Sequence, residues 1–343
     1  MNDKITIKDV AKKAGVSVSI ASFALNNVKG RVSEESKQKV MKAVKELGYV
    51  PNHNAKRLRS QNTDCIMLVY SQSFLDEQNA STVAFILGII KYARKMNKDI
   101  IFRTIFPSSN WEKVVETYDE LWRSRRFDGI IFLPAFEDFV PDWFFSRLYE
   151  SGVNLVSVSP DGGPKEYPII YSNNYFWTQK ALDYIVEKGY KEIYYIGQRY
   201  PDNQRPRRIR AYTDYIENNN IKGSVLEYSS IHRDFGRIER LISPIIDKQQ
   251  NDIAFLCWND VDAIIVLEVL SVKYPDRKFR IGVMGHDDIP TARHTNPPLT
   301  TIKYPFEEVG IQCVDLITES VQERSKEIPS IEIDSSIIER KSL

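Results

Sequence analysis

The chain has 343 residues, 42 % of them hydrophobic, and this size and composition predict two or three folded domains rather than disorder. No stretch of about 18 uncharged apolar residues occurs, and no apolar run follows the N-terminal lysines, so we expect neither a membrane span nor a secretion signal. The three cysteines, Cys65, Cys257 and Cys313, are far apart in apolar surroundings. This is typical of core residues in the reducing cytoplasm.

The net charge of +1 hides an unequal distribution along the chain. Residues 1–62 hold 13 basic and 5 acidic residues, a net charge of +8, whereas the remainder holds 34 basic and 41 acidic residues, a net charge of −7. A small basic domain on an acidic body predicts that only the N-terminus meets a polyanion. A solvated lysine-rich surface is the alternative.

The N-terminal segment predicts two short helices joined by a tight turn. Thr6 is placed to cap the first helix, with Asp9 reaching back to it, and Gly15 is placed to end it in a left-handed conformation. Ser17 then caps the second helix. Such a pair is typical of a helix-turn-helix, in which the second helix enters the DNA major groove. An ordinary helical hairpin is the alternative, which the basic charge of this segment makes less favoured.

A third helix and a linker complete the N-terminal region. The third helix is capped by Ser33 and ended by Gly48, with Val40 on its buried stripe. We therefore assign residues 1–50 to an all-α headpiece. Residues 51–62 are polar and basic and predict a linker with a short helical register. An isolated helix of this length is unstable in water, so we expect it to form when two copies of the chain pair on DNA.

From Cys65 onward, apolar strands alternate with amphipathic helices. The predicted strands are 65–70, 100–106, 130–134, 153–159, 192–197, 253–258 and 279–284, and the predicted helices include 82–96, 111–125, 177–188, 207–218 and 260–272. This alternation predicts an α/β fold with parallel sheets covered on both faces. Residues 63–343 exceed the usual size of an α/β domain with a single hydrophobic core. We therefore expect two lobes with a ligand site between them.

Several short motifs follow one another along the chain in a fixed order. The N-terminal run contains TIKDVAKKAGVS, ALNN, RVSEES and LGYVPN; the later motifs are WND at 258–260, GHDD at 285–288, PPLTTI at 297–302 and ERKS at 339–342, with weaker matches in FDGII at 127–131 and RIRAY at 208–212. Together these motifs resemble the lactose-repressor/galactose-repressor (LacI/GalR) family of bacterial transcription regulators. The resemblance covers essentially the whole chain.

The resemblance implies an architecture of headpiece, hinge helix and two lobes like those of periplasmic sugar-binding proteins. It divides the effector-binding and dimerisation domain, residues 63–343, into a first lobe of about 64–160 and 303–333 and a second lobe of about 161–302 and 334–343. It also implies three chain crossings between the lobes and a homodimer on near-palindromic operator DNA.

The resemblance also implies which residues contact DNA. The side chains of the second helix that match base-reading positions, and that we expect to be exposed, are Val18, Ser19, Ser22 and Phe23. Positions that match backbone contacts are Thr6, Ile7, Ser17, Asn26, Arg31, Ser33, Tyr49 and Asn52. In the hinge, Leu58 matches a residue that wedges into the minor groove, and Ala55 is small enough for two hinge helices to approach closely.

The base-reading positions of this chain are unusual for the family, which often has long polar side chains there. Val18 and Phe23 offer only apolar contacts, for example with thymine methyl groups. Phe23 has an alternative role as a core residue packed against the third helix. The operator sequence is therefore left open.

An effector site is implied at strand ends facing the space between the lobes. Sugar hydroxyls require side chains that accept and donate hydrogen bonds, together with an aromatic face. The matching positions are Asp161, Arg208, Trp258, Asn259, Asp287 and Phe306. Trp258 is either a stacking platform or a core tryptophan, while Asp260 and Asp288 are expected to act as a helix cap and a turn residue.

The basic cluster around Arg208 leaves the effector class open. Arg205, Arg207 and Arg210 surround it, which favours either an anionic effector such as a sugar phosphate or one ligand arginine with solvated neighbours. We expect a repressor of a carbohydrate-uptake or catabolic operon that is released by an inducer, with a corepressor-type regulator as the alternative.

Two other function classes fit the sequence less well. A solute-binding protein that does not bind DNA would share the two lobes but would need a secretion signal. An enzyme would need a phosphate-binding glycine motif or a metal-ligand spacing, and neither pattern occurs. The neighbouring His286 and Asp287 suggest catalysis only if a nucleophile lies beside them, so a turn is the favoured interpretation. We expect no enzymatic activity, no metal and no cofactor.

Overall fold

A computed structural model describes residues 5–25, 30–49, 62–71, 80–105, 110–133, 140–141, 143–159, 165–199, 206–228, 234–323 and 329–343. The chain divides into two compact units, Met1–Asn62 and Thr63–Leu343. No helix among these residues is both long enough and apolar enough to cross a membrane.

The smaller unit is a three-helix headpiece, and its helices begin and end where the sequence predicts. They are α1 (Ile7–Ala14), α2 (Val18–Leu25) and α3 (Glu34–Leu47). Thr6 and Asp9 form a capping box, and Gly15 and Gly48 end α1 and α3 with left-handed φ angles of 67° and 60°. A small core with Val10, Ala21 and Val40 at its centre holds the three helices together.

The first lobe of the larger unit contains a six-stranded sheet of order β11-β5-β4-β3-β1-β2. Its strands are β1 (Cys65–Ser71), β2 (Asp99–Ile105), β3 (Gly129–Phe132), β4 (Leu155–Ser159), β5 (Ile169–Tyr171) and β11 (Ile331–Glu332), all paired in parallel. The helices are α6 (Ala80–Lys95), α7 (Trp111–Arg123), α8 (Trp143–Glu150) and α13 (Phe306–Glu323).

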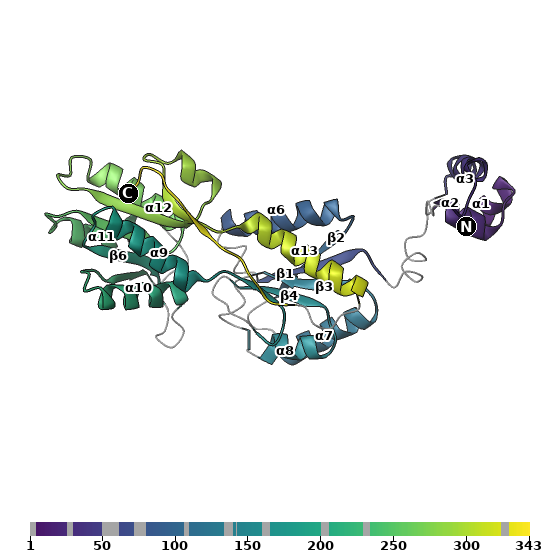
Figure 1. The fold of residues 1–343 in the computed structure, drawn as a ribbon, viewed down its shortest axis with the longest axis horizontal. Helices are drawn as coiled ribbons and strands as arrows, with labels where there is room; N and C mark the ends of the chain where they lie inside the picture. The colour runs from purple at the N-terminus through teal and green to yellow at the C-terminus, as the bar shows by residue number, and fades with distance from the viewer. Residues whose placement is uncertain are drawn as a thin grey trace. The chain divides into compact units, whose positions relative to one another are not determined.

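Helices cover both faces of this sheet, with α6 and α13 on one face and α7 and α8 on the other (Figure 1). The alternation of side chains in β1 explains why both faces of the sheet are covered. Ile66 and Leu68 pack toward α6 and α13, while Met67 and Val69 pack toward α7 and α8. An uninterrupted apolar run is therefore buried on both sides, as expected for a parallel strand.

The second lobe contains a second six-stranded sheet, of order β12-β10-β9-β8-β6-β7. Its strands are β6 (Ile193–Gln198), β7 (Val225–Tyr228), β8 (Ile253–Cys257), β9 (Ile281–Asp287), β10 (Thr300–Lys303) and β12 (Ser336–Ile338). Only β12 is antiparallel to its neighbour, β10. The helices are α9 (Asn174–Glu187), α10 (Arg207–Asn218), α11 (Phe235–Ile246) and α12 (Asp260–Lys273), and a 3₁₀ helix covers Pro290–His294.

The chain passes between the two sheets three times, which agrees with the expected number of crossings. It leaves the first sheet after β5, returns after β10, and crosses again between β11 and β12. The predicted change of lobe at about residue 160 comes too early, because β5 pairs with β4 and β11 and extends the first sheet to Tyr171. A three-residue strand carries too little periodicity to be recognised from sequence.

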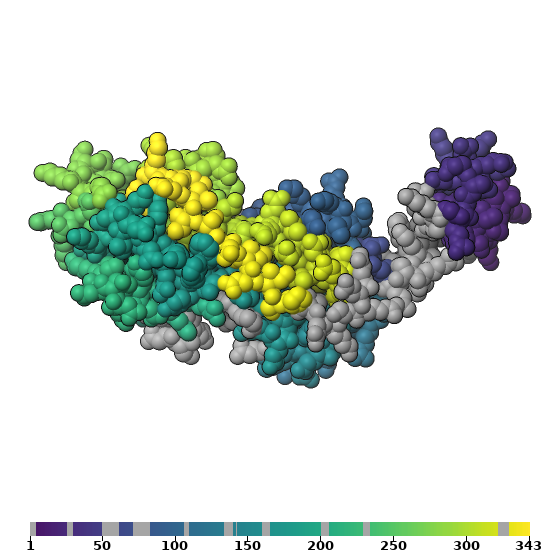
Figure 2. Space-filling model, viewed as in Figure 1, coloured from purple at the N-terminus to yellow at the C-terminus, as the bar shows by residue number. Residues whose placement is uncertain are grey.

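The C-terminal segment is attached firmly to the second lobe. The Ser342 hydroxyl accepts a hydrogen bond from the Thr300 amide at 2.8 Å and donates one to the Val283 carbonyl at 2.6 Å. An Arg340 Nη2 atom lies 2.6 Å from an Asp288 carboxylate oxygen. Strand β12 of this segment pairs with β10, which lies well before it in the sequence. Yellow C-terminal residues are visible on the surface of the larger unit in Figure 2.

Two glycines allow α13 and α6 to approach closely. A Cβ atom added to Gly310 of α13 would lie 2.8 Å from the Gly88 carbonyl carbon and 2.8 Å from the Ile89 amide nitrogen, both in α6. These atoms belong to the backbone and cannot rotate away. The contact between the two helices therefore depends on the absence of a side chain at Gly310.

We expect Gly310→Ala to lower the free energy of unfolding by about 1–3 kcal/mol, because the added methyl group overpacks a backbone contact. Urea unfolding followed by circular dichroism measures the change. Gly236→Ala in α11 is the matched control, since its Cβ would meet only side-chain ends at 3.6 Å. There the reduced freedom of the unfolded chain should give equal or greater stability. Equal behaviour of the two variants would contradict the packing argument.

Candidate DNA-binding surface and effector site

The second helix of the headpiece presents two apolar side chains to solvent. Val18 is 40 % exposed and Phe23 is 37 % exposed, and Ser19 is also exposed. The Ile20 amide donates to the Ser17 hydroxyl at 3.2 Å, so Ser17 caps this helix as predicted. Of the two roles considered for Phe23, the structure favours the outward one.

Ser22 departs from the predicted set of exposed side chains on α2. It is only 9 % exposed, and it lies next to Ala21 on the side that packs against the other helices. The small serine side chain fits close to the headpiece core, and burial removes it from the surface available to a base edge. The prediction that Ser22 is exposed is therefore wrong.

The other predicted backbone-contacting residues divide into capping and packing groups. Thr6 and Ser33 cap α1 and α3, and the Ser36 amide donates to the Ser33 hydroxyl at 3.2 Å. Ile7 and Tyr49 are half-buried against the headpiece core, whereas Arg31 is exposed. Asn26, Asn52, Ala55 and Leu58 lie outside the described residues.

In the larger unit, Arg208 occupies the first turn of α10 and is 7 % exposed. Its Nη1 atom donates to the Trp258 carbonyl at 2.7 Å, and its guanidinium carbon lies 4.8 Å from the centre of the Trp258 ring. Trp258 itself is half-buried and packs with the core beneath α9 and α10. The tryptophan therefore serves as a core residue on which the arginine is stacked.

Asn259 caps α12, a role that the sequence analysis gave to Asp260. The Asp262 amide donates to Asn259 Oδ1 at 3.0 Å. Asp260 is fully buried instead, where its carboxylate accepts hydrogen bonds from the Thr301 hydroxyl at 2.5 Å and the Ile289 amide at 2.8 Å. Burial and the neighbouring Asp287 carboxylate raise the pKa of Asp260 to about 8.

The carboxyl end of β9 holds a buried pair of polar residues. The Nδ1 atom of His286 lies 3.0 Å from an Asp287 carboxylate oxygen, and Asp287 has a φ angle of 118°. Burial and the charge of Arg208 lower the pKa of His286 to about 4, so the imidazole is neutral at physiological pH. Asp288 forms the ion pair with Arg340 described above, which ties this turn to the C-terminal segment.

Phe306 starts α13 and lies in an aromatic group. Its ring centre lies 4.7 Å from that of Phe85 and 4.9 Å from that of Tyr304. Phe306 is half-buried, so part of its ring is available for contact. Asp161, the remaining predicted effector residue, lies outside the described residues.

Two buried nitrogen atoms in this region have no hydrogen-bond partner within the described structure. They are Nε of Arg208 and Nε2 of His286, and their side chains are close enough for the arginine charge to affect the histidine. Since buried polar atoms are nearly always paired, such atoms mark a place for a ligand or water. The sequence pattern around His286 predicts only a turn, because the orientation of its ring depends on the fold.

Comparisons with known proteins agree with this description of the two units. The family model for bacterial regulatory proteins of the lacI family matches residues 6–52, and a model for periplasmic binding protein-like domains matches residues 182–343. The chain belongs to the lacI family. It is a DNA-binding transcriptional regulator, and the matched residues 6–52 include the two helices of its helix-turn-helix, α1 and α2.

Individual relatives resemble this lacI-family regulator over nearly its whole length. The HTH-type transcriptional repressor PurR of Histophilus somni (strain 2336) is 26 % identical over 346 residues, covering 98 % of each chain. A Lac repressor dimer bound to operator and the anti-inducer ONPF has a TM-score of 0.75 at 20 % identity, covering 99 % of each chain. A complex of the transcriptional regulator CelR with cellobiose has a TM-score of 0.62 at 22 % identity, covering 98 % of this chain and 99 % of that one.

We expect the wild-type protein to lose more stability than His286→Gln as the pH falls from about 6.5 to about 4. The folded-state pKa of His286 lies near 4 and that of an unfolded histidine near 6.5, so the unfolded state binds more protons in this window. The stabilisation is complete above the unfolded value and is lost toward the folded one, and it amounts to about 3 kcal/mol. Urea unfolding at several pH values measures it.

Asp260 changes the stability in the opposite direction. Its raised pKa makes the folded state bind more protons than the unfolded state between pH values of about 4 and about 8. This contribution is present in both proteins and cancels in the comparison. If the free energy of unfolding changed equally with pH in wild type and variant, the assignment of a buried neutral histidine would be contradicted.

Proposed function

We propose that this regulator is a cytoplasmic repressor whose DNA binding is controlled by a neutral, hydroxyl-rich effector such as a sugar. The observation that carries the proposal is a pair of buried atoms, Arg208 Nε and His286 Nε2, that have no hydrogen-bond partner in the described part of the chain. A group bound between the lobes at the carboxyl ends of β8 and β9 would meet these atoms. In open α/β sheets this edge is the usual place for a ligand.

The chemistry of the two atoms favours a hydroxyl group. Next to the Asp287 carboxylate, the Nδ1 atom of His286 carries the proton, which leaves a lone pair on Nε2. Arg208 Nε always carries a proton. A hydroxyl group satisfies both atoms because it accepts from the arginine and donates to the histidine. A phosphate or carboxylate oxygen has no proton to donate, and it would leave the Nε2 lone pair unpaired.

The difference in burial among the arginines also supports a neutral effector. Arg208 is buried, whereas Arg207 and Arg210 are exposed. This arrangement favours one ligand arginine with solvated neighbours over the sugar-phosphate alternative. The CelR regulator, whose fold this chain shares, is bound to the neutral disaccharide cellobiose.

We also propose that the regulator acts as a homodimer through an apolar face of the first lobe. Five large side chains of α6 and β2 are exposed there: Val83, Leu87, Ile90, Ile101 and Phe102, with exposed fractions from 37 % to 58 %. β2 is the edge strand of its sheet. Exposed apolar side chains on an edge strand and on a neighbouring helix are typical of a protein interface. The Lac repressor structure with a similar fold is a dimer on operator DNA.

The role as a regulator also accounts for the paired polar residues without invoking catalysis. Asp260, Asp287 and Asp288 are all engaged by neighbouring groups of the fold. We propose that the protein binds its effector without converting it. Incubation with a bound sugar followed by chromatography tests this, and loss of the sugar would contradict it.

For the DNA-binding surface, we expect Phe23→Ala to change sequence preference and Arg31→Ala to change overall affinity. Phe23 contacts bases through an apolar ring, so its removal should cost about 1–3 kcal/mol on the preferred sequence and relax selection there. Arg31 neutralises a phosphate, so its removal should weaken all sequences alike and lower the salt slope by about 1. Selection of duplexes from a random pool, followed by titrations at several salt concentrations, separates the two effects. Identical sequence profiles for wild type and Phe23→Ala would contradict base reading by this ring.

For the effector site, we expect neutral sugars rather than their phosphates to raise the melting temperature. A panel of mono- and disaccharides, including cellobiose and D-ribose, is compared with the corresponding 6-phosphates. A sugar at 100 times its Kd stabilises the folded state by about 2.7 kcal/mol. His286→Phe should abolish this shift, and the matched substitution His294→Phe at an exposed histidine should not. A response confined to phosphorylated sugars would overturn the proposal of a neutral effector.

A further inference from the structure

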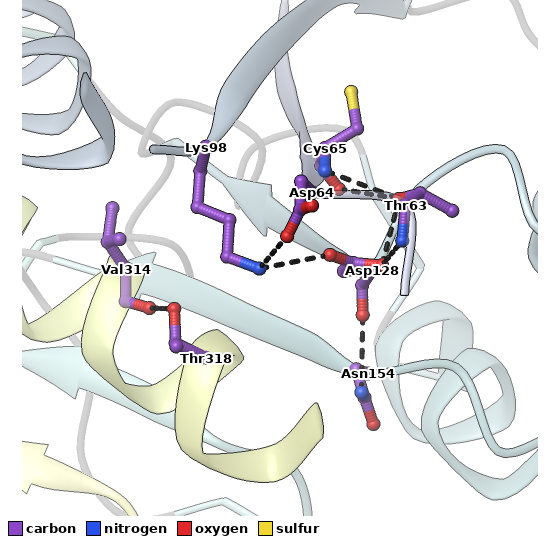
Figure 3. Close-up of polar contacts among 8 residues, drawn as sticks. All are labelled: Thr63, Asp64, Cys65, Lys98, Asp128, Asn154, Val314 and Thr318. Carbon is purple, nitrogen blue, oxygen red and sulfur yellow. Dashed lines mark hydrogen bonds and ion pairs between the residues drawn. The ribbon is translucent and has the colours of Figure 1, made fainter. Parts of the chain in front are cut away.

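A cluster of buried polar side chains lies where the larger unit begins. Thr63, the first residue of this unit, immediately follows the linker in sequence. It meets Asp128 at the start of β3 and Lys98 at the start of β2, at the amino ends of the strands (Figure 3). We call these three residues the linker anchor. The predicted effector residues Trp258, Asn259 and Asp287 lie instead at carboxyl strand ends in the second lobe.

Asp128 holds the anchor together. Its Oδ1 atom accepts hydrogen bonds from the Thr63 amide at 2.6 Å and the Thr63 hydroxyl at 2.8 Å, and its Oδ2 atom lies 3.3 Å from Lys98 Nζ. The Asp128 and Lys98 side chains are 4 % and 7 % exposed. The Thr63 hydroxyl also accepts a hydrogen bond from the Cys65 amide at 3.2 Å. This hydroxyl therefore connects the first residue of β1 to Asp128.

Stability alone is a poor explanation for this arrangement. Removing two charges from water costs roughly what their attraction returns, and apolar residues of similar size usually do as well. What a buried ion pair provides is a defined geometry, because each charge must keep its partner. The Asp128–Lys98 pair therefore fixes the position and direction of the backbone at Thr63.

The anchor is also connected to α13. The Asp128 carbonyl accepts a hydrogen bond from Asn154 Nδ2 at 3.2 Å, and Asn154 Oδ1 accepts one from the Ser320 hydroxyl at 3.0 Å. Ser320 is buried near the C-terminal end of α13. Through Asn154, two hydrogen bonds thus link this helix to the residue that binds Thr63.

The other end of α13 lies at a crossing between the lobes. Its first residue, Phe306, follows the last residue of β10, Lys303, by three positions, and β10 belongs to the second sheet. Phe306 packs on Phe85 of the first lobe. The fourteen residue-to-residue steps from Phe306 to Ser320 span about 21 Å of continuous helix. One rigid element therefore joins a lobe crossing to the linker anchor.

We propose that α13, acting through Ser320 and Asn154, positions the linker anchor and thereby carries lobe movement to the DNA-binding end of the chain. Ser320, Asn154 and Asp128 are positioning residues, since none of them contacts effector or DNA. The proposal rests on effector-controlled DNA binding as set out under Proposed function. Displacement of the Phe306 end relative to the second lobe moves the helix as one body, and the anchor passes this movement to Thr63.

The test compares full-length variants that each remove one hydroxyl group. Ser320→Ala breaks the link to Asn154, and Thr63→Val breaks the side-chain bond to Asp128 while keeping the β-branched shape. Thr318→Val is the matched control: this equally buried hydroxyl of α13 donates only to the Val314 carbonyl of its own helix, at 2.7 Å (Figure 3). Thr63→Ser retains the hydroxyl and should restore wild-type behaviour.

Two quantities are measured for each variant. The first is the ratio of affinities for the duplex that wild type selects from a random pool and for a scrambled duplex, without any sugar. The second is the change in DNA affinity caused by the sugar with the largest thermal shift, where about 5- to 150-fold is usual for coupled sites. We expect Ser320→Ala and Thr63→Val to reduce both quantities by about 2- to 30-fold, and Thr318→Val and Thr63→Ser to leave them unchanged.

The outcomes separate this proposal from the proposed function. If wild type responds to the sugar and Ser320→Ala responds equally with an unchanged affinity ratio, the role of α13 is refuted. If Thr318→Val reduces both quantities as much as Ser320→Ala, general loosening of the helix explains the effect and the proposal also fails. If no sugar affects wild type, effector control is wrong, and the sugar-independent affinity ratio alone decides whether the anchor positions the linker.

Discussion

The constraint on which the larger unit depends is the burial of each parallel sheet on both faces. Strands such as β1 and β8 are apolar along their whole length because helices cover them above and below. Polar groups therefore gather at the strand ends, where the backbone leaves the sheet. In the second lobe Trp258, Asn259 and Asp287 follow or end strands at the carboxyl edge, and in the first lobe Thr63 and Asp128 lie at the amino edge. The same constraint separates a region suited to ligand from a region that holds the linker.

The buried polar groups make this arrangement costly as well as useful. Among the described residues, Arg208 and His286 each have a buried nitrogen atom without a hydrogen-bond partner, and burial beside Asp287 raises the pKa of Asp260 to about 8. Each of these features lowers the stability of the free protein relative to a fully satisfied core. A bound hydroxyl group would remove part of that cost. In this way affinity for the effector derives from groups that are unfavourable when the effector is absent.

The elements predicted correctly from the sequence are those that a short local pattern determines. Thr6, Gly15 and Ser33 cap or end helices through contacts within four residues, and these positions were predicted correctly. The apolar runs of the central strands were also found, to within a few residues. The three-residue strand β5 was missed, and the first lobe was therefore predicted to end too early. Strand pairing of that kind is decided by partners far away in the chain.

The site residues show the same division between local and distant causes. The choice of Asn259 over Asp260 as the cap of α12 depends on Thr301, which draws the Asp260 carboxylate into the core. The burial of Ser22 depends on how α2 packs in the headpiece, which its own helical pattern leaves undecided. From the sequence, His286 was predicted only to form part of a turn. Its importance follows from Arg208 and Asp287, which the fold brings to either side of it.

The three crossings of the chain affect how the protein can be made. The first sheet lacks its edge strand β11, and the α6 face of that sheet lacks its partner helix α13, until residues beyond 306 have been synthesised. The second sheet likewise needs β12 and the Ser342 contacts at the end of the chain. The headpiece contains only local contacts and is complete after the first 50 residues. On the ribosome, the DNA-reading part therefore forms early, while both lobes must wait for the final stretch of the polypeptide before either can close its core.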